Sequence, residues 1–366
     1  MTFLTSLTIS HFRSYKQAKF DLDKRPVAIF GPNGSGKTNI LEAVSLFSPG
    51  RGLRGSSAES MMRKPDCLGW KIIGHVMSGD RLMEIVFSSI NGAARAVAID
   101  GKNTTQIALA QHSRVLWLVP SMDRLWVEGA EGRRRFLDRI SLSFFPSHAE
   151  NTLRYEKSMR ERNRLLKNQV SDPHWYKALE RQMAEAGAAI NIARERALEF
   201  ILTSQRGATT EFPVAELELQ QTEGSLPRTT EDLCDALKES RLRDLATGRT
   251  TVGPHKTDVC GAYAAKNIPA SQCSTGEQKA LLISIVLANA RALTHNYGKA
   301  PLLLLDEISA HLDKDRRAAL YEEICALGLQ AWMTGTDGDL FEEFGNRAQF
   351  IQVGLMGNTS NGSLTD

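Results

Sequence analysis

The sequence has few cysteines, and they lack the spacing that metal clusters or disulfide frameworks need. Its 366 residues include five cysteines, scattered at Cys67, Cys234, Cys260, Cys273 and Cys325 with no C-x-x-C pair. Zinc sites and small disulfide-bonded scaffolds depend on closely spaced or even-numbered cysteines. The sequence therefore predicts neither feature, and its cysteine usage fits a reducing cytoplasm.

Long apolar segments are missing as well. The longest mostly apolar run covers residues 280–288, within a helix expected to end near Leu293. A bilayer span needs about 20 apolar residues. The N-terminus, MTFLTSLTISHFRSYK, lacks the basic start and apolar centre of a secretory signal. We therefore expect a cytoplasmic protein without membrane contact.

An excess of charge of one sign is the third absence. The formal net charge is +3, so a nucleic-acid partner would need a local basic patch, because the bulk charge selects no partner. The chain is 42% hydrophobic, which is enough to fill the cores of two or three domains at this length.

Secondary-structure signals divide the chain into three parts. Residues 1–120 show short apolar runs that read as strands, with a helix after Thr38. Residues 121–245 are charged and mostly helical in period, which predicts an inserted helical lobe. Residues 246–366 return to α/β character, and their tail, residues 357–363, is expected to be disordered.

The stretch FGPNGSGKTN, residues 30–39, matches the phosphate-binding pattern G-x-x-x-x-G-K-T. Apolar runs on both sides supply the strand–loop–helix context that this pattern requires. Glycines let backbone N–H groups point at phosphate oxygens, and a helix start attracts negative charge. We predict that Lys37 neutralises the β- and γ-phosphates of ATP and that the Thr38 hydroxyl ligates Mg²⁺. The expected nucleotide-binding residues here are Gly31, Pro32, Asn33, Gly34, Ser35, Gly36, Lys37, Thr38 and Asn39.

An all-apolar run, residues 302–305, ends in two acids. Asp306 is the expected partner of Mg²⁺, directly or through water, and Glu307 is the expected base that polarises an attacking water. Lys37 and Asp306 must meet one ion although they lie near opposite ends of the chain. The two ends are therefore expected to build one sheet around the inserted middle.

The segment CSTGEQK, residues 273–279, precedes a long apolar helix. Ser274 followed by Glu277 is a capping box, so the segment taken alone favours a simple helix N-cap. It also lies upstream of Asp306, where ATP-binding-cassette proteins carry their signature motif. On that plan Ser274, Gly276 and Glu277 contact the γ-phosphate held by a second subunit. The motif therefore implies an ATP-dependent head-to-tail homodimer.

Two downstream segments extend the resemblance to cassette ATPases. Residues 309–313, SAHLD, follow the acids as a D-loop would, and residues 334–337, TGTD, end the next strand where a switch histidine usually stands. The matching residue is Thr336, the fourth predicted catalytic residue beside Lys37, Asp306 and Glu307. A threonine hydroxyl can bond a phosphate but cannot take a proton at neutral pH. This predicts slow turnover, as in a timer or clamp.

Further motifs are similar to the RecF family of SMC-like ATPases. Residues 7–15, LTISHFRSY, resemble the opening strand of SMC-like ATPases, and residues 128–138, 155–167 and 251–258 resemble RecF proteins nearly end to end. The insertion is short compared with SMC coiled coils. The resemblance implies an α/β fold, an ABC-type ATPase head (a P-loop NTPase with a mixed sheet and helices) with an inserted helical lobe. Residues 1–120 and 246–366 would form the head.

The same resemblance implies a bacterial recombination mediator with weak DNA-dependent ATPase activity. Such a protein would dimerise on ATP, bind duplex, gapped or single-strand-junction DNA, and act with RecR and RecO to load RecA in gap repair, replication restart and SOS induction. Residues 120–123, PSMD, depart from the usual proline-glutamate-aspartate version of their motif. The glutamine that relatives use near Mg²⁺ is left open between Gln106 and Gln111.

The sequence leaves the DNA-contacting residues open. Basic side chains gather at Arg51, Arg54, Arg133, Arg134, Arg135, Arg160, Arg162, Arg164 and Lys167. Solvated helix surfaces explain such residues as well as DNA does. Arg13 and Ser14 are alternative nucleotide contacts. With neither a zinc knuckle nor a recognition-helix motif in the sequence, binding to the DNA backbone without sequence preference is expected.

Two other functions stay open at this point. One is an SMC-like ATPase subunit that drives a partner nuclease, which would carry a long coiled coil with a C-x-x-C metal hook. The other is a nucleotide-binding scaffold with no DNA role. Retention of duplex DNA with and without ATP separates these functions from an ATP-gated DNA-binding dimer.

Overall fold

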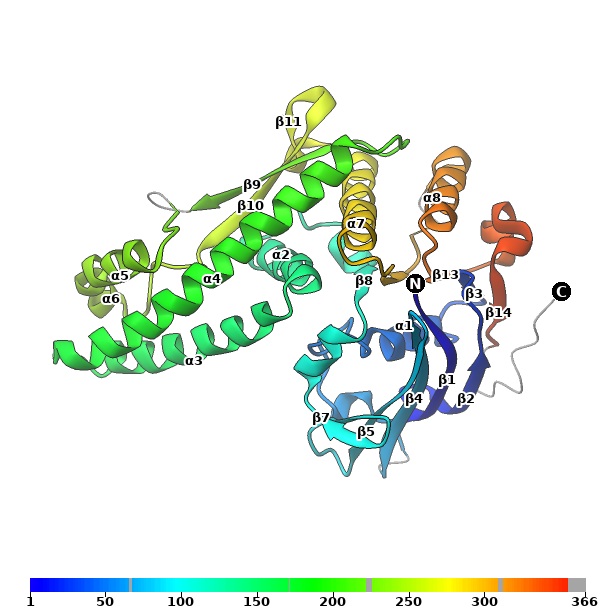
Figure 1. Ribbon diagram of the computed structural model, residues 1–366, viewed down its shortest axis with the longest axis horizontal. Helices are drawn as coiled ribbons and strands as arrows, with labels where there is room; N and C mark the ends of the chain where they lie inside the picture. The colour runs from blue at the N-terminus through cyan, green and yellow to red at the C-terminus, as the bar shows by residue number, and fades with distance from the viewer. Residues whose placement is uncertain (66–67, 171, 222–225, 309–311, 355–366) are drawn as a thin grey trace. The chain divides into compact units, whose positions relative to one another are not determined.

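The computed structural model describes residues 1–65, 68–170, 172–221, 226–308 and 312–354 (Figure 1). The chain folds into two compact units. The first, called the head below, comprises Met1–Asp123, Gly207–Pro213 and Ser274–Asp366, and the second, called the lobe, comprises Arg124–Arg206 and Val214–Cys273. The expected D-loop residues 309–311 and the expected disordered tail lie outside the described residues.

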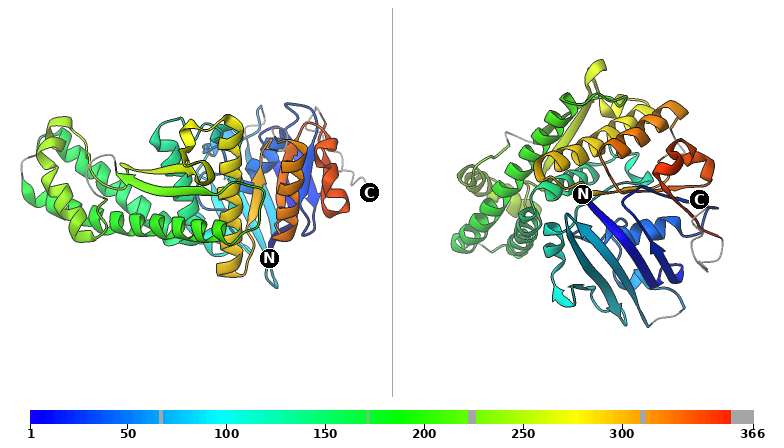
Figure 2. Two further views of the ribbon diagram at one scale, coloured as in Figure 1. Left: turned by 90° about the horizontal axis from the view of Figure 1, so that it is seen from above. Right: turned by 45° about the vertical axis from the view of Figure 1, so that its right-hand side comes forward.

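One sheet of the head is antiparallel and has six strands. Their order is β2 (Tyr15–Asp21), β1 (Thr2–Phe12), β4 (Gly69–Ser78), β5 (Arg81–Ile90), β6 (Ala96–Ile99) and β7 (Lys102–Thr104). Buried and partly exposed residues alternate along β4 and β5, as expected for a sheet with one face toward a core (Figure 2, right). The hairpin expected around residues 78–80 joins these two strands.

The second sheet of the head is entirely parallel and has five strands. Their order is β14 (Gln349–Gln352), β3 (Val27–Phe30), β13 (Ala331–Gly335), β12 (Leu302–Leu305) and β8 (Val115–Leu118). All four residues of β12 and of β8 are buried, as in a sheet covered on both faces. Strands from both ends of the chain thus form one sheet around the insertion, which confirms the predicted α/β fold class.

The head also contains three α-helices. They are α1 (Lys37–Ser45), α7 (Thr275–Tyr297) and α8 (Lys314–Ala326). Short 3-10 turns occur at η1 (Glu59–Met61), η2 (Gln106–Gln111), η3 (Pro120–Met122) and η7 (Gly338–Arg347). The core between sheets and helices is well packed: Phe47 and Phe87 meet edge to face with ring centroids 5.0 Å apart. This core fixes the strand ends that carry the predicted site.

The lobe is built on two long helices that pack side by side, α3 (Ser147–Lys167) and α4 (Pro173–Arg206) (Figures 1 and 2). Three shorter helices belong to it, α2 (Ala130–Phe144), α5 (Thr230–Glu239) and α6 (Arg241–Thr247). A three-stranded antiparallel sheet, β11-β10-β9, completes it, with β9 (Ala215–Gln221), β10 (Thr257–Tyr263) and β11 (Ile268–Pro269). The turns η4 (Ala264–Lys266) and η5 (Ala270–Gln272) flank β11.

The boundary between lobe and C-terminal head differs from the expected one. The sequence places it at residue 245, whereas the compact unit of the lobe continues to Cys273. The reason is strand pairing: β10 joins β9 through seven residue pairs from Thr257↔Gln221 to Tyr263↔Ala215. A strand this far along the chain cannot be assigned to lobe or head from local pattern alone.

A buried ion network ties the lobe helices together. The Arg162 side chain has no solvent exposure, and its guanidinium donates to Asp244 at 2.7 Å and to Glu180 at 3.1 Å. Removing one member of such a network would leave an uncompensated buried charge. Arg162 is therefore a structural residue, and its candidacy for DNA contact was wrong, because the whole side chain is enclosed.

None of the helices among the described residues combines the length and apolar character needed to cross a bilayer.

Candidate nucleotide-binding site

The glycine loop lies between β3 and α1 in the head and is held closely by its neighbours. Gly31 has φ 148°, and a Cβ atom there would lie 2.2 Å from the Val353 carbonyl oxygen. Gly36, the N-cap of α1, has φ 101°, and a Cβ there would lie 2.6 Å from the Ser14 hydroxyl. Both positions require glycine, through backbone conformation and through close approach. The loop thus has the tight geometry expected of a phosphate cradle.

Lys37 opens α1 and lies across this loop. Its ammonium donates to the carbonyl oxygens of Gly31 at 2.7 Å and Pro32 at 3.0 Å, and the residue is only 4% exposed. Burial lowers the pKa of Lys37, while the nearby carboxylates of Glu307 and Asp306 oppose that shift. A lysine held among carbonyls and carboxylates at a helix start is placed to meet an anion.

The predicted metal ligands meet directly although they come from opposite ends of the chain. The Thr38 hydroxyl donates to Asp306 Oδ1 at 3.0 Å. Asp306 follows β12 and is 6% exposed, and its N–H donates to the Leu118 carbonyl at 3.0 Å. A carboxylate and a hydroxyl beside a glycine loop form the oxygen donor set that Mg²⁺ prefers.

Glu307 extends from the same strand end in an unusual backbone conformation. Its φ is 54°, which is uncommon outside glycine, asparagine and aspartate. Its N–H donates to the Thr334 hydroxyl at 2.9 Å, which holds this conformation. The fixed backbone sets the direction in which the Glu307 carboxylate leaves the strand, beside Lys37.

The residues of the loop fit a triphosphate with a metal ion. Two buried hydroxyls at the loop, Ser35 Oγ and Tyr15 Oη, have no hydrogen-bond partner among the described residues. Tyr15 lies against Gly36, since a Cβ there would be 3.0 Å from its oxygen. Buried hydroxyls without a partner are costly, so a ligand rich in acceptor oxygens would satisfy them.

The tip of α7 carries the predicted signature residues. Ser274 is the N-cap, with its N–H donating to Glu277 Oε2 at 2.8 Å and its hydroxyl accepting from the Glu277 N–H at 3.4 Å. Ser274 and Gly276 are exposed, and a Cβ at Gly276 would meet nothing within 4 Å. The capping box is thus present, and the tip has open space before it. In the next turn, Lys279 pairs with Asp123 at 3.2 Å and anchors the start of the helix.

Other predicted residues take different positions. Thr336 is exposed just beyond β13, and Asn39 bridges the Ser14 hydroxyl (2.9 Å) and Arg54 (2.9 Å). Gln106 accepts from the Arg95 guanidinium, and Gln111 is exposed at the end of η2. The role of Thr336 therefore stays a prediction.

A buried acid on α1 was not foreseen. Glu42 has no solvent exposure and binds the Arg13 guanidinium through both carboxylate oxygens, at 2.8 and 2.6 Å, as well as Arg54 at 3.1 Å. Arg13 is therefore engaged with Glu42 rather than free to face a nucleotide. The signal was available: an acid inside the apolar run ILEAV on a buried helix needs a cationic partner.

Thr334 is the second residue that the sequence did not single out. It is fully buried, donates to Asp306 Oδ1 at 2.8 Å and accepts from the Glu307 N–H. Pattern matching pointed instead to Thr336, two residues later on the same side of the strand, where no strand neighbour holds it. Thr334 sets the positions of both acids at once.

Thr334→Val should lower the free energy of unfolding by about 1–3 kcal/mol, because an isosteric methyl group leaves the Glu307 N–H without its acceptor. It should also weaken the Mg²⁺ dependence of nucleotide binding, since Asp306 loses an orienting donor. Thr334→Ser keeps the hydroxyl and is the matched control. Thermal unfolding and Mg²⁺ titration of nucleotide affinity check this, and equal behaviour of the Val and Ser variants would contradict it.

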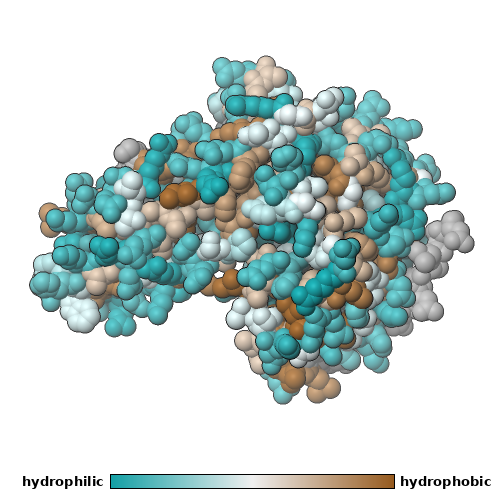
Figure 3. Space-filling model, viewed as in Figure 1, coloured by the Kyte–Doolittle hydropathy of each residue, from teal (hydrophilic) through white to brown (hydrophobic). Residues whose placement is uncertain are grey.

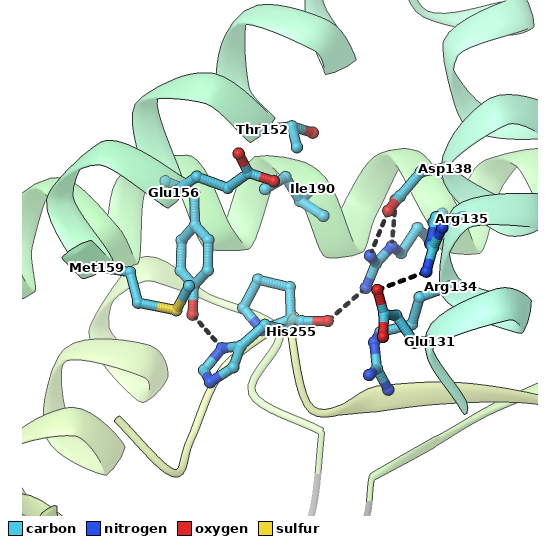
Figure 4. Close-up of a pocket in the computed structure, with 12 residues that line it drawn as sticks. Glu131, Arg134, Arg135, Asp138, Thr152, Glu156, Met159, Ile190 and His255 are labelled. Carbon is cyan, nitrogen blue, oxygen red and sulfur yellow. Dashed lines mark hydrogen bonds and ion pairs between the residues drawn. The ribbon is translucent and has the colours of Figure 1, made fainter. Parts of the chain in front are cut away.

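The motifs of the lobe converge on a separate pocket of about 260 Å³ (Figure 4). The Tyr155 hydroxyl and His255 Nδ1 lie 2.7 Å apart, and the Arg194 guanidinium binds both oxygens of Asp138 at 2.8 and 3.0 Å. Burial lowers the pKa of His255 to about 4, so it is neutral at physiological pH. Its main cations are paired: Arg135 with Glu131, and Arg194 with Asp138.

Of the three consecutive arginines at 133–135, Arg133 is also committed inside the lobe. It forms a two-pronged ion pair with Asp258, at 2.9 and 2.8 Å, and donates to the carbonyls of Leu125 and Glu128. The remaining basic candidates Arg51, Arg160, Arg164 and Lys167 are exposed.

Comparison with known proteins identifies relatives over nearly the whole chain. The family described as RecF/RecN/SMC N terminal domain matches residues 3–354. The DNA replication and repair protein RecF of Rhizobium rhizogenes (strain K84 / ATCC BAA-868) is 45% identical over 368 residues, covering 98% of each chain. The protein of the same name from Agrobacterium fabrum (strain C58 / ATCC 33970) is 44% identical over 370 residues, again covering 98% of each.

Solved structures support the same fold. The recombination mediator protein RecF-ATPrS in the RecFOR pathway has a TM-score of 0.83 at 23% identity, with 96% of each chain covered. The Smc head domain with an extended coiled coil from Pyrococcus furiosus, bound to the C-terminal domain of ScpA, has a TM-score of 0.55 at 19% identity, covering 98% of this chain and 95% of that one. At these identities the likeness concerns the fold.

Proposed function

The chain belongs to the RecF family of DNA replication and repair proteins, and on that premise we propose that it is an ATP-gated DNA-binding dimer. In this role it binds ATP and Mg²⁺ at the head, dimerises on ATP and holds duplex or gapped DNA. The single observation that carries the proposal is the 3.0 Å hydrogen bond between Thr38 and Asp306 beside the glycine loop.

In this proposal each group of the head site has one role. The loop N–H groups and Lys37 hold the phosphates of ATP, and Thr38 and Asp306 hold Mg²⁺, which would offset the charge of the phosphates when bound. Glu307 takes a proton from the attacking water at its carboxylate. Thr334 supports this assignment, because its hydroxyl joins both acids.

A second copy supplies the remaining part of the site. The exposed Ser274 and Gly276 at the tip of α7 offer a hydroxyl and a helix N-terminus to the γ-phosphate held by the partner. Hydrolysis then removes the group that both copies share, so the dimer opens. ATP turnover acts as a weak, DNA-dependent switch. Thr336 is proposed to reach the γ-phosphate in the closed dimer.

The biological partners follow from the family. One of the solved structures above is that of a recombination mediator of the RecFOR pathway. We propose that this chain likewise acts in the cytoplasm with RecR and RecO to load RecA at gaps, in gap repair, replication restart and SOS induction. A subunit that drives a nuclease is the alternative, but the arm formed by α3 and α4, of 21 and 34 residues, carries no C-x-x-C hook.

Glu307→Gln should slow hydrolysis by at least about tenfold, because the amide cannot accept a proton from water. The variant should therefore stay dimeric in ATP and retain duplex DNA, whereas without ATP it should release it. Filter retention of labelled duplex DNA with ATP, with ADP and without nucleotide measures this.

The control is the unaltered chain under the same conditions, where retention should decay as ATP is consumed. Equal retention of DNA with and without ATP would defeat the gating proposal. A normal hydrolysis rate in the variant would instead show that another group positions the water.

A further inference from the structure

A second pocket of the lobe is lined by cations. It has a volume of about 200 Å³ and is bounded by Arg243, Arg249 and Lys256, with Gln221, Thr247, Thr251 and Val252. Of the described residues that line it, none carries a negative charge. Three positive charges around one small hollow attract anions, and this pocket has no role in the head chemistry described above.

Local backbone geometry brings two of these cations together. Helix α6 ends at Thr247, and Gly248 then adopts φ 66° and ψ 18°, which turns the chain back on itself. The Arg249 N–H donates to the Asp244 carbonyl at 3.2 Å, which closes this turn. Lys256 comes from a second turn, in which its N–H donates to the Gly253 carbonyl at 2.8 Å.

The back wall of the pocket is rigid because the buried network supports it. Thr251 donates to Asp244 Oδ1 at 2.6 Å and accepts from Arg243 Nε at 3.1 Å. Asp244 in turn is fixed by Arg162 at 2.7 Å and by Ser240 at 2.9 Å. The Asp244 carboxylate is fully buried behind the threonine and neutralised by Arg162, so it does not cancel the charge of the pocket. Such support holds the cations in place before a ligand arrives.

The pocket of Figure 4 has a different balance of charge. There, the acids Glu131, Asp138 and Glu156 lie among the lining residues, and two arginines are paired with two of them. That pocket offers little net positive charge. The pocket at Arg249 has the opposite balance, and the lobe surface visible around α5 and α6 is largely hydrophilic (Figure 3).

We propose that the pocket formed by Arg243, Arg249 and Lys256 binds a phosphate group of the DNA backbone. This inference rests on the proposed function, since it names a place where the lobe holds the DNA. Arginine forks and lysine ammonium groups are the side chains that recognise phosphate oxygens through charge-assisted hydrogen bonds. Because such contacts carry no base information, the pocket would position DNA of any sequence.

The test is a salt titration of DNA binding by the full chain. The double variant Arg249→Ala/Lys256→Ala should bind duplex DNA in ATP on the order of tenfold more weakly at low salt. Its slope of log affinity against log salt should be smaller by about 0.9 for each DNA phosphate that the pocket no longer neutralises. Lys177→Ala, which removes one exposed charge from α4 away from this pocket, is the matched control and should keep the slope.

Three further measurements fix the meaning of the result. Arg249→Lys/Lys256→Arg should restore the slope, thermal unfolding should show the double variant folded, and ATP binding should be unchanged. Inorganic phosphate at constant ionic strength tests whether the pocket takes the free ion instead, and protection of Lys256 from acylation by phosphate but not by DNA would overturn the proposal. An unaltered slope in the double variant overturns the lobe site alone, whereas no DNA retention by the unaltered chain overturns the proposed function with it.

Discussion

Lys37→Ala should abolish measurable ATP binding, with an affinity loss on the order of a hundredfold or more. Hydrogen bonds to charged groups contribute about 1.5–3 kcal/mol each, and Lys37 is expected to serve two phosphates. The lysine is already buried at the loop, 2.7 Å from the Gly31 carbonyl, so no other cation can replace it without moving the loop. Calorimetric titration with ATP and Mg²⁺ gives the affinity directly.

A matched control comes from β2. Lys19 is a surface lysine, 63% exposed and 3.3 Å from Asp21. Lys19→Ala removes the same charge from the head and should leave ATP binding unchanged. Thermal unfolding must show that the Lys37 variant keeps its fold, since it also loses two hydrogen bonds to carbonyls. An ATP affinity within a few-fold of the unaltered chain would remove the lysine loop from the proposed mechanism.

Ser274→Arg should leave ATP binding intact and prevent ATP-dependent dimerisation. The side chain would project from the tip of α7 into the open space beside Gly276, where a partner's nucleotide must approach. Overpacking an interface costs about 1–3 kcal/mol and the missing cap about 1 kcal/mol more, so association should weaken on the order of a hundredfold. Sedimentation velocity with a non-hydrolysable ATP analogue measures the dimer.

The chain offers a second capping box for comparison. Thr229 caps α5 in the lobe through the same reciprocal bonds with Asp232 that Ser274 makes with Glu277. Thr229→Arg therefore costs a similar amount of helix stability away from the tip of α7. It should dimerise normally. If both variants fail to dimerise, the effect is one of folding and the shared site loses its support.

Much of the head could be predicted from the sequence because its signals are local. The loop pattern predicted the strand–loop–helix unit, and the apolar run before Asp306 predicted the strand, so the meeting of Thr38 with Asp306 followed from one shared ion. What escaped prediction depends on contacts between distant segments. Thr334 matters because β13 lies beside β12, and Glu42 because Arg13 and Arg54 converge on it.

The lobe shows the same division. Its long helices were expected from their period, but the pairing of β10 with β9 moved the boundary to Cys273. Charged residues were the least predictable. Arg162 and Arg133 looked like the other surface arginines in the sequence, yet carboxylates from distant segments bind both. Only the assembled fold reveals that Arg249 and Lys256, which the sequence did not single out, share a pocket.

The shared site is tested most directly by mixing the two head variants. Lys37→Ala and Ser274→Arg should each fail to form the ATP dimer alone. In a mixed dimer, however, the intact loop of the Ser274→Arg chain faces the intact helix tip of the Lys37→Ala chain. One complete site is then rebuilt, and sedimentation of a labelled chain should show ATP-dependent association only in the mixture. A mixture that stays as monomeric as its components would contradict the account.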